Sequence, residues 1–233
     1  MFAVFFRTII AEITDLSRRF QTIRSRMSNI ELRGCRLGSL DMPRSKEFNP
    51  ARALDKAMRL FWRSGYENTS LEALMKDMGI AKQSLYDTFG DKRSLYLKAL
   101  AFYRDQTNGE MQRTFDDIPS VKDGFAKLLY GLAGETGEQH ERGCLLLSAN
   151  LQRDPKDAVV KEFLRDNQVR VEAIFVRALR RAQKQGELSP KEDPAALGRF
   201  FVVTIQGMRA MARLQSDRRA LEQVAKVALS VFN

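Results

Sequence analysis

Cysteine and histidine are scarce in this chain of 233 residues, which has two cysteines and one histidine. Cys35 and Cys144 cannot build a disulfide framework, and such low usage suggests a reducing compartment, the cytoplasm. His140 stands outside any cluster of Cys and His side chains with zinc-ligand spacing, so we expect no metal and no cofactor. No apolar run is long enough to span a bilayer, so we expect no membrane partner.

The sequence motifs of several enzyme classes are also missing. The chain has no GxxxxGK phosphate-binding loop and no GxSxG nucleophile elbow, and its glycines are scattered. Its one histidine lies in a polar stretch, so no nucleophile with a neighbouring base can be recognised. An all-helical enzyme is the alternative from another functional class, but we expect no enzymatic activity.

Positive charge is in excess, with a net charge of +10 and a pI near 9.8, which permits nucleic-acid binding. The excess is spread along the chain, at +4 in residues 1–45, +2 in residues 46–93 and +4 in residues 94–233. Charge alone therefore gives only weak support to a nucleic-acid partner.

Residues 65–92 predict two short helices joined by a tight turn. Thr69 or Ser70 can cap the first helix, and Thr69 with Glu72 makes a capping box. Gly79 can adopt the positive φ that commonly ends a helix. The apolar side chains between these signals recur at three- and four-residue spacing: Leu71, Leu74, Met75 and Met78.

The second helix, residues 81–89, has Lys82, Gln83 and Ser84 in its first turn. In a helix-turn-helix this helix enters the major groove of DNA with its N-terminal residues facing the base edges. Lysine can contact phosphate or guanine, glutamine can contact adenine, and hydroxyls can contact phosphate. Spacing alone leaves open a second interpretation, a helical hairpin within an ordinary bundle.

A family resemblance decides between these interpretations. FWRSGY at 61–66, TSL at 69–71, Gly79 and LYDTFGDKRSL at 85–95 resemble the DNA-binding domain of the TetR family of bacterial transcriptional repressors, over residues 47–98. The resemblance implies an all-α fold, with an N-terminal three-helix helix-turn-helix domain and a C-terminal helical bundle for ligand binding and dimerisation. Ala81 departs from the pattern, because the family usually has a capping Ser or Thr there.

The resemblance also implies a function. We expect a cytoplasmic, nucleoid-associated repressor that binds a palindromic operator in double-stranded DNA and is released by a small-molecule effector. Lys82, Gln83 and Ser84 are then expected to contact the groove. The residues expected mainly at phosphates are Thr69, Ser70, Tyr86, Thr88 and Lys92.

We expect three parts along the chain: an N-terminal extension at 1–45, the helix-turn-helix domain at 46–93 and the regulatory and dimerisation domain at 94–233. The extension has a short apolar opening and an Arg-rich amphipathic stretch, which is compatible with a membrane-surface helix. We favour translation from Met27 or Met42, and expect the segment to be poorly ordered.

Periodicity and capping residues predict the remaining helices. Asn49 followed by Pro50 should start the first helix of the DNA-binding domain, and Gly65 should end it. The later helices are expected at about 92–113, 120–132, from 144, 155–185, 194–214 and 217–232, with Asp91, Ser120 and Asp217 as N-caps.

The last two of these helices are apolar over more than one stripe. A helix that is apolar all round must be buried all round, either in the monomer core or against a second subunit. The residues alone leave both possibilities open. The family resemblance implies a homodimer through these helices, about 194–214 and 217–232.

The regulatory domain is expected to hold an effector cavity between its helices. The residues that could line it are Phe102, Met111, Phe115, Phe125, Leu147, Phe163, Phe175 and Met208. Each of them also fits an ordinary hydrophobic core.

Cys144 offers an alternative mode of regulation. The sequence RGCLLLSA places it near a helix N-terminus and beside Arg142, two features that raise the reactivity of a thiol. Gly-Cys-Leu at this point resembles the pattern of a subset of the family, and the region is similar to that of a family repressor whose cysteine senses electrophiles. The other interpretation is a small buried apolar residue, as free cysteines usually are.

Overall fold

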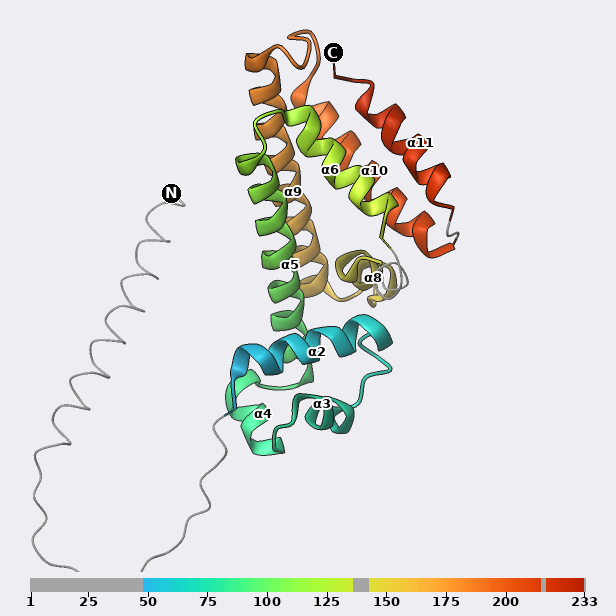
Figure 1. Ribbon diagram of the computed structural model, residues 1–233. Helices are drawn as coiled ribbons and strands as arrows, with labels where there is room; N and C mark the ends of the chain where they lie inside the picture. The colour runs from blue at the N-terminus through green and yellow to red at the C-terminus, as the bar shows by residue number, and fades with distance from the viewer. Residues whose placement is uncertain (1–47, 136–142, 215–216, 233) are drawn as a thin grey trace, which may run out of the picture. The chain divides into compact units, whose positions relative to one another are not determined.

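The computed structural model describes residues 48–135, 143–214 and 217–232, and all regular structure in these ranges is α-helical, which confirms the all-α prediction (Figure 1). The expectations for residues 1–45, Cys35, His140 and Arg142 lie outside the described residues. The helices are α2 Pro50–Ser64, α3 Leu71–Met78, α4 Lys82–Phe89, α5 Lys92–Asp117, α6 Val121–Ala133, α8 Leu145–Gln152, α9 Ala158–Gln185, α10 Pro194–Leu214 and α11 Arg218–Leu229.

Helix α2 has the predicted start and end. The Asn49 side chain accepts hydrogen bonds from the backbone N–H groups of Ala51 at 3.0 Å and Arg52 at 3.2 Å, and Pro50 occupies the first helical position. Gly65 ends the helix at φ 76°, a value that side chains with a Cβ rarely adopt.

The start of α3 corrects the predicted capping box. Ser70 is the N-cap, with its hydroxyl accepting from the Ala73 N–H at 3.1 Å. Thr69 is buried and donates its hydroxyl to the Gly65 carbonyl at 2.6 Å, so it cannot form the box with Glu72. A second tertiary bond, from Lys56 Nζ to the Asp77 carbonyl at 2.8 Å, holds the far end of α3 against α2.

Three later boundaries also differ from the predictions, and one of them is the end of α11, at Leu229 and not at residue 232. Helix α5 is capped by Asp91 as expected but continues beyond residue 113 to Asp117, while α9 begins at Ala158 and not at 155. The later start follows from Asp157, whose carboxylate accepts from the Val160 N–H at 3.0 Å. Ser120 and Asp217 cap α6 and α11 as predicted.

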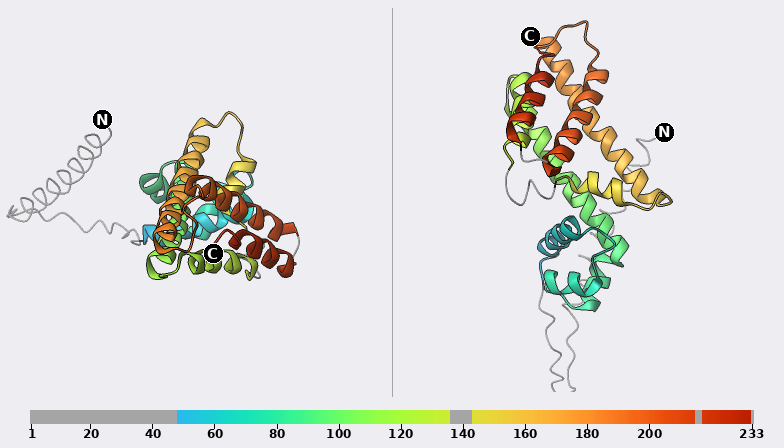
Figure 2. Two further views of the ribbon diagram at one scale, coloured as in Figure 1. Left: turned by 90° about the horizontal axis from the view of Figure 1, so that it is seen from above. Right: turned by 90° about the vertical axis from the view of Figure 1, so that its right-hand side faces the viewer.

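The described helices share two hydrophobic cores, one toward each end of α5. The first joins α2, α3 and α4 to the start of α5, to α8 and to Val160 at the start of α9. The second joins the end of α5 to α6, α9, α10 and α11 around a group of phenylalanine rings, of which Phe125 and Phe201 are stacked with centroids 4.0 Å apart. Helix α8 lies between α2 and the bundle formed by α6, α10 and α11 (Figure 2).

Candidate functional site

Helix α4 presents the predicted polar side chains to solvent. Leu85 and Phe89 are buried in the first core, which fixes the rotation of the helix. The remaining positions are outward: Lys82, Gln83, Tyr86 and Thr88 are exposed, and Ser84 is half-buried. The structure therefore brings these five residues together on one helix, in an orientation that can enter a major groove.

Asp87 is a member of this face that sequence reasoning missed. Its carboxylate accepts a hydrogen bond from Gln83 Nε2 at 2.7 Å, across one helical turn. The four-residue spacing of glutamine and aspartate was a usable signal, because such pairs are neighbours on a helix surface. Asp87 holds the Gln83 amide in one orientation and is itself a potential acceptor for cytosine N4.

Two lysines of α5 contact the neighbouring DNA-binding elements, Lys98 at the end of α4 and Lys92 at Tyr66, which follows α2. Lys98 Nζ donates to the carbonyls of Thr88 at 3.2 Å and Phe89 at 3.1 Å, which satisfies the last turn of α4. The Lys92 ammonium lies 4.4 Å from the centroid of the Tyr66 ring, at the first residue of α5. The positive end of a long helix and a lysine thus coincide, as a phosphate site requires.

Of the two residues expected at the start of α3, only Ser70 faces solvent. Thr69 has 1% of its surface exposed, and its hydroxyl is already bonded to Gly65. A phosphate contact from the Thr69 side chain therefore does not fit its position, because the group is covered by its own protein. We leave it out of the DNA-contact set below.

A cavity of about 310 Å³ lies between α5, α8, α9 and α10. Of the residues predicted to line such a cavity, Met111, Leu147, Phe175 and Cys144 do so. Phe115 and Phe125 belong to the second core and Phe102 packs against the first, and the cavity lining includes none of them, nor Phe163 or Met208.

One wall of the cavity holds a group of polar side chains: Tyr103, Cys144 and Arg209. Cys144 is half-buried at the N-cap of α8, and Arg209 Nη1 donates to the Tyr103 hydroxyl at 3.4 Å. Burial raises the pKa of Tyr103, and the charge interaction with the neighbouring Cys144 raises it further, whereas Arg209 opposes the shift. Arg209 and Tyr103 were not predicted, because nothing local in the sequence places them beside Cys144.

Helix α8 contacts both the cavity and the DNA-binding helices. Leu145 and Ala149 are buried in the first core, whereas Leu147 and Asn150 line the cavity. At the end of α8 the Gln152 side chain lies so near α2 that a Cβ on Gly65 would be 2.8 Å from it. Any displacement of α8 by a cavity ligand would therefore bear directly on α2.

An apolar surface remains exposed on α10 and α11. The buried faces of these helices reach the second core through residues such as Phe201, Met208 and Leu221. Their outward faces carry Phe200, Val203, Met211, Leu214, Val224 and Val227, all exposed. We call these six residues the outer apolar face.

The described residues give no sign of a membrane span or a metal site. No helix in the described ranges is both long and apolar enough to cross a bilayer. The same residues hold no group of three or more His, Cys, Asp or Glu side chains that could bind a metal ion.

Comparison with known proteins gives consistent matches over both halves of the described chain. Residues 53–99 match the family described as "Bacterial regulatory proteins, tetR family", and residues 130–228 match the "Tetracyclin repressor-like, C-terminal domain". The HTH-type transcriptional regulator YezE of Bacillus subtilis (strain 168) is 31% identical over 82% of this chain and 100% of its own length. The HTH-type transcriptional repressor ComR of Escherichia coli (strain K12) is 30% identical over 81% of this chain and 91% of its own.

A solved structure agrees with these relatives. A cysteine mutant of the TetR family transcriptional regulator CifR, complexed with 26-bp double-strand operator DNA, superposes with a TM-score of 0.73. It is 31% identical and covers 82% of this chain and 100% of its own. The resemblance found in the sequence is thus confirmed, and the chain belongs to the TetR family of DNA-binding transcriptional regulators.

Proposed function

We propose that this protein is a dimeric cytoplasmic repressor that leaves its operator when a small molecule occupies the cavity between α5, α8, α9 and α10. The observation that carries the proposal is the double role of α8, which lines the cavity and is also buried against the DNA-binding helices. Residues 46–93 serve as the DNA-binding part and residues 94–233 as the regulatory and dimerisation part. Relatives described as repressors support the direction of regulation.

The exposed face of α4 supports a distinction between residues that contact bases in the groove and residues that contact phosphates. Lys82, Gln83 and Ser84 contact the groove, with Asp87 orienting the Gln83 amide. The residues at phosphates are Ser70, Tyr86, Thr88 and Lys92.

The outer apolar face supports a twofold dimer through α10 and α11. Val203 and Val227 are 67% and 69% exposed, which is unfavourable for valine unless a second subunit covers them. A twofold dimer would place two α4 helices about 34–36 Å apart, one turn of DNA. Val227→Glu should leave the monomer folded but abolish both the dimer in sedimentation and operator binding, whereas Lys184→Glu, far along α9, should do neither.

Effector coupling follows from a difference in affinity between two states. A ligand that binds more tightly to a state in which α8 and α2 have shifted will populate that state, and two displaced α4 helices no longer match the operator spacing. The usual coupling free energy for such regulation is about 1–3 kcal/mol. A ligand with equal affinity for both states would release no DNA.

A second mode of regulation, through the thiol of Cys144, is favoured by one specific observation. Cys144 lines the cavity together with Tyr103 and Arg209, and the Tyr103 hydroxyl accepts a hydrogen bond from Arg209. An electrophile entering the cavity would thus meet a thiol beside a guanidinium, and the adduct would form at the N-terminus of α8. Cys144→Ser should abolish release by N-ethylmaleimide while keeping operator binding, and unchanged release would exclude this mode.

The distinction between groove and phosphate contacts is tested by salt dependence. Lys92→Ala should weaken binding to all DNA sequences alike and reduce the slope of log affinity against log salt by about one unit. Gln83→Ala should instead change the preferred sequence, with the slope nearly unchanged. Lys184→Ala removes the same charge as Lys92→Ala but lies near the end of α9, and should change neither property. Identical behaviour of the first two variants would contradict the assignment.

A further inference from the structure

The charge of the cavity lining has one sign. Four cationic side chains line it, Arg153, Lys161, Arg165 and Arg209. No aspartate or glutamate among the described residues contributes to the same lining. A cavity whose charged lining residues are all cations, and whose other walls have a low dielectric constant, concentrates anions.

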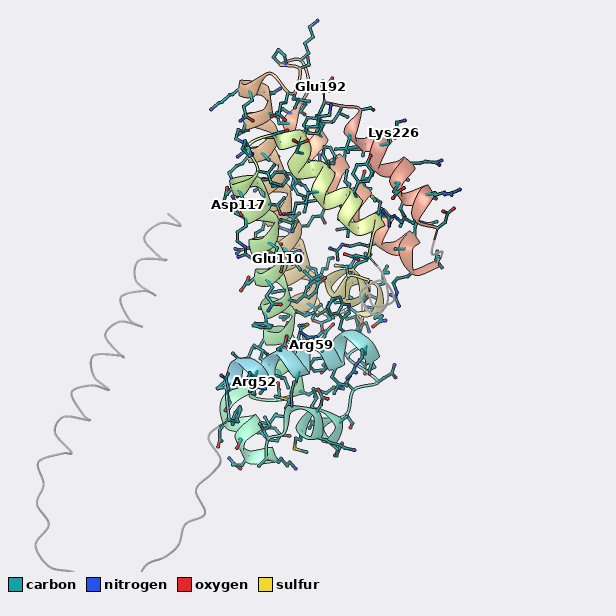
Figure 3. The ribbon with its side chains drawn as sticks, in the orientation of Figure 1. Arg52, Arg59, Glu110, Asp117, Glu192 and Lys226 are labelled. Atoms are coloured by element: carbon teal, nitrogen blue, oxygen red, sulfur yellow. The ribbon has the colours of Figure 1, made fainter. Side chains whose placement is uncertain are left out.

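A neighbouring hollow on α5 provides an internal comparison. It shares Thr107, Met111, Ile205 and Arg209 with the cavity, but three carboxylates line it: Glu110, Asp117 and Glu135. Glu110 and Asp117 are two of the side chains labelled on α5 in Figure 3. The carboxylates offset the cations of that hollow, and Glu135 acts on the shared Arg209 as well. Of the two, only the first cavity has a described lining whose charged side chains are all cations.

The cavity also has an apolar interior. Its walls include Met111, Leu146, Leu147, Leu164, Val171, Phe175, Val202 and Ile205, contributed by four different helices. Such walls favour a hydrocarbon or aryl body over a fully hydrated ion such as inorganic phosphate. The lining therefore selects for a molecule that is both apolar and anionic.

The four cations differ in how they can act on a ligand. Lys161 and Arg165 are exposed, and Arg165 Nε already lies 3.8 Å from Glu162 Oε2. Arg153 donates to the carbonyls of Asp154 and Pro155. Exposed charges of this kind contribute little to affinity because water and salt screen them, although they attract anions toward the opening.

Arg209 is better placed to hold a head group. It is half-buried on α10, and its hydrogen bond to the Tyr103 hydroxyl, at 3.4 Å, is long. Burial lowers the pKa of Arg209, but Tyr103, Cys144 and Glu135 together raise it above its ordinary value, so the side chain stays charged. A guanidinium has five N–H donors, enough to bind a carboxylate in a bidentate pair beside the Tyr103 hydroxyl.

We propose that the effector is a small organic acid with an apolar body, whose carboxylate binds Arg209 and Tyr103 while the body lies along the apolar walls. The inference rests on the proposed function, in that it assigns a chemical class to the effector of that cavity. A neutral amide of the same shape could accept from Arg209 through its carbonyl oxygen, but its NH2 group would face the guanidinium donors and the charge of Arg209 would stay unpaired, which is unfavourable. The carboxylate thus provides selectivity for anions over neutral molecules, and burial of the apolar body contributes to affinity.

The test compares octanoate with octanamide, which share a shape and differ in charge. Titration calorimetry on the full chain, without DNA, should give about tenfold tighter binding of octanoate, equivalent to about 1.4 kcal/mol. Arg209→Gln should remove this preference, and Arg209→Lys should keep part of it, because lysine keeps the charge but loses the bidentate geometry. Arg180→Gln, an equal charge change at an exposed position of α9, should leave the preference intact.

Several results would overturn the inference: equal binding of the two probes, no binding of either, or a preference that survives Arg209→Gln in a protein with unchanged circular dichroism. Loss of the preference for octanoate in Lys161→Gln, with Arg209 unchanged, would also overturn it. Operator release is measured separately by fluorescence anisotropy. Octanoate that binds as expected without releasing DNA would contradict the ligand-released repressor and leave the chemistry of the cavity standing. Release of DNA by octanamide without binding of octanoate would contradict the proposed chemistry of the cavity and leave the ligand-released repressor standing.

Discussion

The exposed face of α4 and the cavity between α5, α8, α9 and α10 are built in opposite ways. The face of α4 comes from one eight-residue helix, and the burial of Leu85 and Phe89 fixes which side chains point outward. The cavity takes its lining from α5, α8, α9 and α10, together with Arg153 between α8 and α9. One site is thus determined by local spacing and the other by long-range packing.

This difference explains which aromatic residues line the cavity. Phe115, Phe125 and Phe175 are all helical, and all three are nearly or fully buried. Only Phe175 also borders the cavity. Whether a buried ring faces other rings or an empty space depends on four helices at once, so no periodicity in one helix can tell the two cases apart.

The largest effect we predict is a loss of stability from a core residue that does not line the cavity. Phe125→Ala should lower the free energy of unfolding by about 3–5 kcal/mol, because the ring is fully buried against Phe115, Phe175, Phe201 and Phe232. Chemical denaturation followed by circular dichroism measures the change. Tyr130→Ala, on the exposed side of the same helix, should cost much less. A small loss of stability with a large loss of effector affinity would instead place Phe125 at the cavity.

The next prediction concerns α8, where the two kinds of site meet. Ala149→Leu adds volume to a position that is 3% exposed in the first core, and should cost about 1–3 kcal/mol through overpacking. Because α8 shares the first core with α2, the shift that accommodates the larger side chain should disturb the DNA-binding helices, and operator affinity should also fall without any effector. Leu151→Ala, at a position 74% exposed on the same helix, should change stability by no more than about 0.5 kcal/mol and leave DNA binding intact.

Capping chemistry was the most dependable guide to the fold. Asn49, Asp91, Ser120 and Asp217 all start helices as predicted, because an N-cap bond forms within three residues and needs no tertiary information. The Thr69 prediction was wrong for the complementary reason. Two adjacent hydroxyl residues could each cap α3, and tertiary burial of Thr69 decides in favour of Ser70.

In the candidate site, too, the sequence predicted features that depend on local spacing and missed those that depend on tertiary contacts. The outward residues of α4 could be named from spacing and family pattern, but their partners depended on geometry, as with Asp87 on Gln83 and Tyr66 under Lys92. In the cavity, Cys144 was a candidate because of its helix N-terminus. Tyr103 and Arg209 come from helices far away in the sequence and could not have been joined to it.

A gain of stability is predicted on the DNA-binding side. Ala81 caps α4 with extended backbone, φ −72° and ψ 157°, but has no side-chain bond to the helix. Ala81→Ser should supply that bond and stabilise the protein by about 1 kcal/mol, seen as a higher denaturation midpoint. Ala51→Ser, inside the first turn of α2, should bring no gain because Asn49 already caps that helix. A loss at position 81 would mean that the hydroxyl cannot reach the first turn.

The smallest predicted effect lies on the ion pair that joins α5 to the start of α9. Arg93 Nη2 is 2.7 Å from Asp157 Oδ1, and a partly exposed pair of this kind contributes about 0.2–1 kcal/mol, so Arg93→Gln should cost that much at neutral pH. The Val160 N–H lowers the pKa of Asp157 most, and Arg93 lowers it further, below the ordinary value of 3.8. A depressed carboxyl pKa stabilises the fold above the unfolded value and loses this effect as the pH falls through the folded value. Denaturation curves recorded from neutral pH to below 3.8 should therefore converge for the two proteins. A difference that persists in acid would mean that Arg93 acts by packing across this junction and not by its charge.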